Sequence, residues 1–172
     1  EWAGAGTFNM TDVTVTDQSA DLADPEYILT ASSTDSGGNT NWVFPVGALT
    51  AADVTPASLA TSANGNVTVE FTNESVIPSN GKIVIVFPAG FDVSGVSGAT
   101  SAADIDGSLA VGIVGQTVTI TRSGGTAIAE GTVINDLILA GVTNPSFDGL
   151  TGDFTVSTTD SSDLTFDTVA VG

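Results

Sequence analysis

The sequence predicts an all-β fold, an antiparallel β-sandwich, and three observations support this. Apolar and polar residues alternate in short runs along most of the chain, which is the period of a strand with one buried face. Turn-forming dipeptides such as Asn64-Gly65 and Asp106-Gly107 separate these runs, roughly as often as in sandwich proteins. No helical period of useful length is present. We therefore expect an Ig-like or jelly-roll-like sandwich.

The first strand predicted along the chain belongs to an N-terminal extension. We expect residues 1–52 to form this extension and residues 53–172 to form the sandwich. A strand rich in Thr and Asp covers 7–16, and two further strands are expected near 27–31 and 41–46. The apolar side chains of the first strand are Phe8, Met10, Val13 and Val15. Their alternation shifts parity between Met10 and Val13, which predicts a bulge.

The strands of the sandwich domain follow in order. Alternating runs predict strands with one buried and one wet face at Val67–Phe71, Leu109–Ile113, Val118–Ile120 and Phe154–Val156. Ile83–Phe87 is a continuous apolar run, which predicts a strand covered on both faces. Asn135 and Asp136 interrupt the run from Val133 to Leu139, so we expect a bulge or a sheet edge there.

Charge excludes two classes of partner. The chain has 20 acidic residues against Lys82 and Arg122, and a net charge of −18. Two cations cannot neutralise a track of phosphates, so we expect no nucleic-acid partner. No apolar run approaches the roughly 18 residues of a membrane span, so we expect no membrane insertion of the mature chain. The chain starts at Glu1 without an apolar leader, as a secreted protein does after signal removal.

Composition also argues against catalysis. Without His or Cys, the chain lacks the commonest general base and the thiolate nucleophile. A pair of carboxylates of the glycosidase type would remain possible, but no pair is singled out by its surroundings. We assign no catalytic residue and expect that the protein is not an enzyme.

Four segments of the sandwich domain resemble a known family. They are DVTPASL (53–59), VTVEFTNESVIPSNGKIVIVFPAGFDVSG (67–95), GQTVTITRSGGTAIAEGT (115–132) and LAGVTNPS (139–146). Together they resemble a β-sandwich repeat of large microbial cell-surface and adhesin-like proteins. The resemblance covers about two-thirds of the chain. It implies an extracellular structural domain, often present in tandem copies, without catalytic residues.

The N-terminal strand suggests how a single copy associates with others. It is either an edge strand of its own sheet or a donor strand that completes the sheet of a neighbour. Head-to-tail donation propagates without closing, so we predict a homopolymer, a secreted pilus-like filament. The predicted subunit contacts are Trp2, Phe8, Met10, Val13 and Val15. The alternative is an adhesin or carbohydrate-binding domain, in which Trp2, Trp42 and Tyr27 stack on sugars.

Two kinds of ligand or modification site complete the predictions. Asn9, Asn66 and Asn73 begin N-x-Ser/Thr sequons and are candidates for glycosylation, and we expect Asn66 and Asn73 to be accessible. Acidic turns are candidates for Ca²⁺ binding, although turns also favour aspartate on conformational grounds alone. The candidate metal ligands are Asp104, Asp106, Asp160 and Asp163. No other cofactor is expected.

Overall fold

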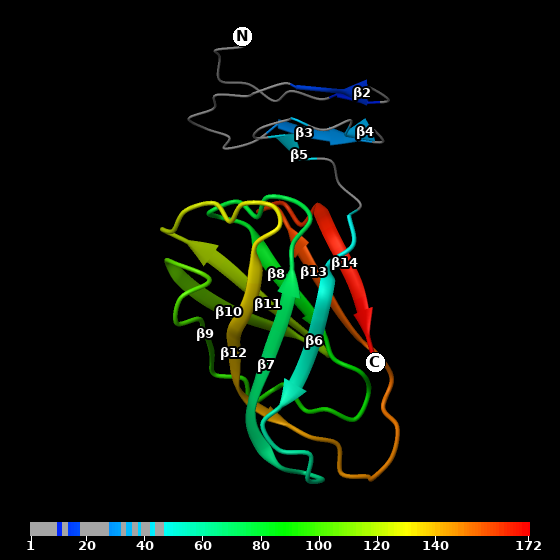
Figure 1. The fold of residues 1–172 in the computed structure, drawn as a ribbon. Helices are drawn as coiled ribbons and strands as arrows, with labels where there is room; N and C mark the ends of the chain where they lie inside the picture. The colour runs from blue at the N-terminus through cyan, green and yellow to red at the C-terminus, as the bar shows by residue number, and fades with distance from the viewer. Residues whose placement is uncertain are drawn as a thin grey trace.

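The structure is a computed structural model, and its described residues are 10–11, 14–17, 28–31, 34–35, 38, 42–43 and 47–172. All regular structure in these residues is β. Two antiparallel sheets pack as a sandwich, which confirms the predicted fold class (Figure 1). Among the described residues there is no helix that is long and apolar enough to cross a membrane.

Short parallel strands precede the sandwich. β1 (Met10–Thr11) pairs with β3 (Ile28–Ala31), and β3 pairs with β5 (Trp42–Val43). β2 (Thr14–Val15) pairs with β4 (Thr34–Asp35). Figure 1 shows β2 to β5 in a separate layer, beyond the end of the sandwich at which β6 begins. Their parallel pairing sets them apart from the antiparallel sandwich.

The larger sheet of the sandwich has five strands. In spatial order they are β10 (Ser108–Val114), β11 (Thr117–Ser123), β8 (Lys82–Val86), β13 (Phe154–Thr159) and β14 (Thr165–Val171). All four pairings are antiparallel. The hairpins β10–β11 and β13–β14 therefore lie on either side of a central β8.

The smaller sheet has four strands. In spatial order they are β6 (Thr50–Pro56), β7 (Asn64–Thr72), β12 (Val133–Thr143) and β9 (Gly98–Thr100). The register of β12 against β7 shifts between Ile134 and Leu137. This shift confirms the bulge predicted at Asn135 and Asp136, where two consecutive polar residues interrupt an apolar strand.

The core lies between the two sheets. Ile83 and Ile85 of β8 face Val69 and Phe71 of β7, and all four are at most 1% exposed. At one end the core closes with three phenylalanines, Phe87, Phe91 and Phe154, whose ring centroids are 5.2 to 5.7 Å apart. Tilted and edge-on rings at such distances add to the stabilisation that burial provides.

The outer face of β8 corrects one prediction. Ile83 and Ile85 are buried, but Val84 is half-buried and Val86 is 38% exposed. The expectation that this strand is covered on both faces is therefore wrong for its outer face. The physical reason is that a two-layer sandwich covers one face of each sheet, and here the other face is apolar without being covered.

The sandwich starts ahead of residue 53. Leu49 is 2% exposed and belongs to the core, and β6 begins at Thr50. Just before them, Gly47 forms a parallel bridge with Asp167 of β14. The connection into the sandwich therefore contacts the larger sheet before β6 joins the smaller one.

Candidate functional site

The outer edge of β10 is the candidate functional site. β10 pairs with β11 over all seven residues without a register shift. Within the described residues, no strand or bridge pairs with its other side. The strand contains no charged residue and no proline, two devices by which natural sheets discourage the addition of a further strand. We call Ser108–Val114 the open edge.

The other three sheet edges carry such protection. β6 contains Asp53, ends at Pro56 and has a register shift beside Asp53. β9 is only three residues long. On β14, Gly47 N–H donates to the Phe166 oxygen at 3.0 Å and the Gly47 oxygen accepts from Thr168 N–H at 3.2 Å. Charges, proline, shortness and a covering segment all oppose strand addition, so β10 is the edge most open to it.

The inner side of the open edge offers an apolar floor. Leu109, Val111 and Ile113 are half-buried and pack against the core. The four-stranded sheet ends nearby in the short β9, so these side chains are less covered than Val118 and Ile120 of β11. An added strand would gain backbone hydrogen bonds along β10 and apolar contacts with alternate side chains, as in β-strand addition.

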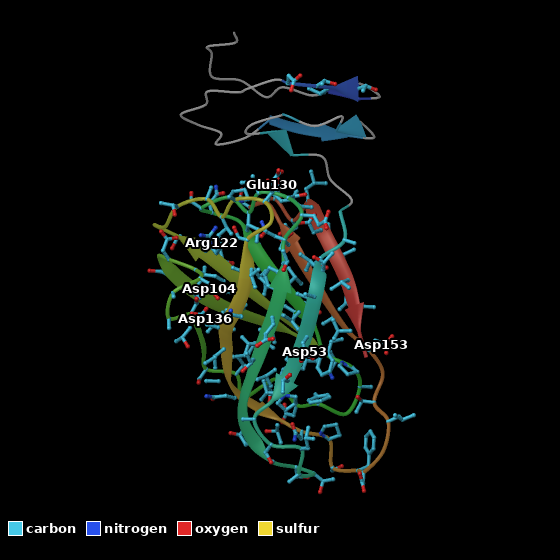
Figure 2. The ribbon with its side chains drawn as sticks, in the orientation of Figure 1. Asp53, Asp104, Arg122, Glu130, Asp136 and Asp153 are labelled. Atoms are coloured by element: carbon cyan, nitrogen blue, oxygen red, sulfur yellow. The ribbon has the colours of Figure 1, made fainter. Side chains whose placement is uncertain are left out.

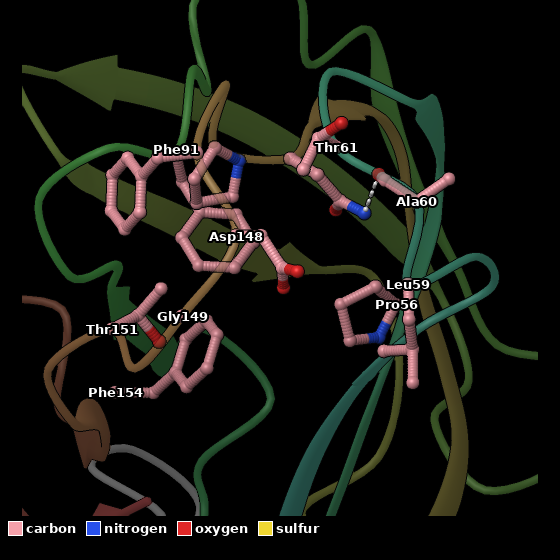
Figure 3. Close-up of a pocket in the computed structure, with 12 residues that line it drawn as sticks. Pro56, Leu59, Ala60, Thr61, Phe91, Asp148, Gly149, Thr151 and Phe154 are labelled. Carbon is pink, nitrogen blue, oxygen red and sulfur yellow. Dashed lines mark hydrogen bonds between the residues drawn. The ribbon is translucent and has the colours of Figure 1, made fainter.

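A pocket of about 330 Å³ lies between the loop that follows β6 and the loop that joins β12 to β13. Figure 3 shows Phe91 and Phe154 on one side and Pro56 and Leu59 on the other. The loop after β6 is fastened there by Asn144, whose Nδ2 donates to the Ala60 oxygen at 3.0 Å. The exposed side chains at its rim are Leu59 (87%), Phe147 (49%) and, in the same loop, Leu150 (99%). Apolar side chains grouped in this way mark a second candidate contact surface.

The predicted subunit-contact strand is only partly described. Met10 lies in β1 and Val15 in β2, and Val15 is 5% exposed. Trp2, Phe8 and Val13 lie outside the described residues, so their predicted role is untested. β1 and β2 pair with strands of their own chain, so donation to a neighbour stays a prediction. Of the two tryptophans, Trp42 lies in β5.

The sequons fall in different environments. Asn66 is exposed at the start of β7, and its glycosylation stays a prediction. Asn73 is 0% exposed, and its Nδ2 donates to the oxygens of Ser75 (2.7 Å) and Ala129 (2.8 Å). The expectation that Asn73 is accessible is therefore wrong, because its amide fastens two loop segments inside the fold. Asn9 lies outside the described residues.

The first pair of candidate metal ligands accepts hydrogen bonds from distant segments of the chain. Asp104 Oδ2 accepts from Asn135 N–H at 2.8 Å. Asp106 accepts from the Thr126 amide at 3.0 Å and from the Thr126 hydroxyl at 2.9 Å. The backbone N–H and then the hydroxyl of Thr126 lower the pKa of Asp106. These carboxylates therefore fasten their loop to segments 31 and 20 residues away along the chain.

The second pair of candidate metal ligands binds backbone amides and a lysine. Asp160 Oδ1 accepts from the amides of Ser162 and Leu164, both at 2.8 Å. Asp163 lies 2.6 Å from Lys82 Nζ. In the described part of the chain, no group of three acidic side chains is arranged to hold a metal ion. Binding of Ca²⁺ to any of the four aspartates stays a prediction.

Two charged groups that the sequence did not single out are buried. Arg122 is 1% exposed and donates to the oxygens of Ile77 (3.1 Å), Pro78 (2.6 Å) and Thr126 (2.7 Å). Asp167 is 0% exposed and accepts from the Ser75 amide and hydroxyl, both at 2.8 Å. Both tie loops to strands. Only the scarcity of cations in the sequence could have drawn attention to Arg122. Nothing in the local sequence distinguishes Asp167.

A third charged group, whose hydrogen bonds the sequence did not predict, is Asp136 in the bulge of β12 (Figure 2). It accepts from the Ser101 hydroxyl and from the amides of Ala102 (2.8 Å), Ala103 (2.6 Å) and Asp104 (3.4 Å). Desolvation raises the pKa of Asp136, but these hydrogen bonds together outweigh it, so the pKa lies below 3.8. The bulge thus aims Asp136 at the segment that follows β9.

Comparison with known proteins adds little beyond the fold. No family model matches the sequence, and no curated protein matches it significantly. A non-cellulosomal cohesin from the hyperthermophilic archaeon Archaeoglobus fulgidus is similar in structure, with a TM-score of 0.41 and 9% identity over 70% of this chain and 89% of that chain. A chain of the CaDoc0917–CaCohA2 complex has a TM-score of 0.41 and 14% identity over 70% and 98%. Likeness this distant carries no argument about function.

Proposed function

We propose that this chain is a noncatalytic structural subunit outside the cell that polymerises head to tail by β-strand complementation into a pilus-like filament. The observation that carries the proposal is the open edge, Ser108–Val114, which has no charge, proline or bulge and, among the described residues, no strand partner on its outer side. A long apolar edge of this kind takes up a further strand readily.

The donor in this proposal is the N-terminal segment of the next copy. Phe8 and Met10 alternate, Val13 and Val15 continue on shifted parity, and the bulge predicted between the two pairs would bring all four to one face. That face would lie on Leu109, Val111 and Ile113 of the open edge. Among the described residues of one chain, β1 and β2 form two-residue pairings, and exchanging these for a longer ladder costs few hydrogen bonds.

Composition supports the noncatalytic and extracellular parts of the proposal. The chain has no His or Cys, and the carboxylates described above accept from backbone amides and hydroxyls or, for Asp163, from Lys82. A charge of −18 repels phosphates and keeps isolated subunits apart until a specific contact forms. A subunit of this kind works by its shape, its rigidity and its strand pairing.

Negative-stain microscopy of the full chain and of a chain lacking residues 1–17 tests the donor. We expect filaments from the first sample only. For the acceptor, Val111→Lys places an inward charge on the open edge, a natural means of blocking strand addition. Val169→Lys is the matched control, because Val169 is also a half-buried valine, on the opposite edge of the same sheet.

We expect Val111→Lys to abolish filaments and Val169→Lys to leave them intact, with both variants folded by circular dichroism. Filaments that survive Val111→Lys would show that β10 is not the acceptor. A full-length chain that remains monomeric at all concentrations would refute polymerisation.

A second candidate function is an adhesin or carbohydrate-binding domain of a cell-surface protein. The pocket that Phe91, Phe147 and Phe154 help to line favours it. Phe147 is exposed there and lines the pocket with Phe91 and Phe154, and Leu150 is exposed in the same loop as Phe147. Phe147→Ala and Leu150→Asp should then abolish binding to glycans or to cells and leave filaments intact. Loss of filaments without loss of adhesion would favour the first function.

A further inference from the structure

The outer face of the five-stranded sheet is made of small uncharged side chains. One row across all five strands contains Val114, Thr117, Val86, Thr155 and Ala170. The adjacent row contains Gly112, Thr119, Val84, Ser157 and Thr168. Their chain neighbours, such as Val118, Ile85 and Val156, are fully buried, so the residues of both rows point away from the core. We call these two rows the neutral face.

The neutral face is exceptional in so acidic a chain. With 20 acidic residues in 172, neither row contains a carboxylate. The next row contributes Lys82, whose charge is paired with Asp163. By contrast, the outer face of the four-stranded sheet places Asp53 directly opposite Glu70.

This difference decides which face of the molecule another copy could approach. The protein has two cations, and Arg122 is buried while Lys82 is bonded to Asp163. A contact through the four-stranded sheet would bring Asp53 and Glu70 of two copies together without cations to neutralise them. A contact through the neutral face brings no carboxylates together, so it avoids both repulsion and the cost of burying a charge.

We propose that a second copy of this chain stacks on the neutral face, sheet against sheet. Two sheets pack face to face about 10 Å apart. Val84, Val86 and Val114 supply apolar area, and threonine methyl groups fill the spaces between them. The two rows offer no aromatic ring on which a sugar could stack, which favours a protein surface over a polysaccharide.

The size of the face indicates what kind of contact this is. Five strands about 4.8 Å apart, with two rows that span about four residues of 3.3 Å rise on each strand, give roughly 24 by 13 Å, or about 300 Å² per copy. This is below the roughly 800 Å² per partner of a standard interface. One such contact is weak, but many in register reinforce each other. The inference thus rests on the proposed function: filaments would associate side by side through this face.

Thr119→Glu tests the stacking, because Thr119 lies between Gly112 and Val84 in the middle of the sheet. Thr68→Glu is its matched control on the four-stranded sheet. Thr68 is also a half-buried threonine within a long strand, between Thr55 and Ile138. The two variants have the same residue change and the same net charge, and thermal melting checks that both are folded.

Low-speed sedimentation and microscopy of assembled filaments provide the measurement. We expect Thr119→Glu to form single filaments that no longer pellet as bundles, with lateral association at least about tenfold weaker because a carboxylate would be buried in the contact. Thr68→Glu should behave like the unmodified chain. Equal behaviour of the two variants would overturn the inference.

The proposed function can fail without deciding this inference. If the full chain forms no filaments, sedimentation equilibrium at millimolar protein tests the stacking directly. A dimer that Thr119→Glu abolishes and Thr68→Glu retains supports it, and a monomer overturns it. Binding of the unmodified chain to an insoluble polysaccharide that Thr119→Glu abolishes, without self-association, also overturns it.

Discussion

Replacing Arg122 by Met tests whether this buried cation holds one end of the sandwich together. The guanidinium donates to the oxygens of Ile77, Pro78 and Thr126 at 2.6 to 3.1 Å. Asp106 Oδ1, at 3.4 Å from Nη2, belongs to a side chain that is 52% exposed. A Met side chain still fills apolar space but donates no hydrogen bond, so the loss is confined to polar contacts.

The expected loss follows from these contacts. Three hydrogen bonds from a charged donor contribute about 1.5 to 3 kcal/mol each. Two of the oxygens keep another donor, since Ile77 also accepts from Ile128 and Pro78 from Gly81. Removing the arginine also relieves the desolvation of its charge, which costs several kcal/mol. We therefore expect the free energy of unfolding to fall by about 3 kcal/mol.

Urea unfolding followed by far-ultraviolet circular dichroism measures this loss. Lys82→Met is the matched control, because it removes the chain's other cation and changes the net charge equally. Its partner Asp163 is 71% exposed, so the pair should contribute no more than about 1 kcal/mol. If the two variants lose equal stability, the buried hydrogen bonds of Arg122 are not what stabilises this end.

Three further predictions follow from particular contacts. Gly141→Ala should lower the free energy of unfolding by about 2 to 3 kcal/mol, because the φ of Gly141 is +93° and a Cβ there would meet a backbone oxygen. The control Gly112→Ala, whose Cβ would meet nothing within 4 Å, should change it by less than about 1 kcal/mol. Equal losses of the two variants in urea would contradict this prediction. In a glycosylating host, peptide mass spectrometry of the folded protein should find sugar on Asn66 and none on the buried Asn73; sugar on Asn73 would refute its burial. Because the pKa of Asp136 is lowered in the fold, its carboxylate stabilises the folded state at pH values above the unfolded pKa near 3.8, and this stabilisation is lost as pH falls through the folded pKa. Asp136→Asn should therefore melt at a lower temperature than the unmodified chain at pH 7 and approach it below about pH 4. A difference in melting temperature that stays constant with pH would contradict this.

Local pattern was sufficient where burial alternates along a strand. The runs at 67–71 and 118–120 predicted β7 and β11, because a half-buried strand shows its two faces in consecutive residues. The bulge in β12 was predicted for the same local reason, from Asn135 and Asp136. The run at 83–87 misled, because an apolar outer face that is uncovered has the same sequence pattern as one that is covered.

The sequence by itself determined the all-β class and six strands of the sandwich, β7, β8, β10, β11, β12 and β13, since these depend on local periodicity. Only the tertiary structure decided which edge is open, which sequon is buried and what the lone arginine does. Each of these depends on segments that are distant along the chain: Arg122 binds the oxygen of Ile77 across 45 residues, and Asn73 binds that of Ala129 across 56. That β10 is the most open edge likewise depends on the other sheet edges, which are covered, short or charged. No single strand contains that information.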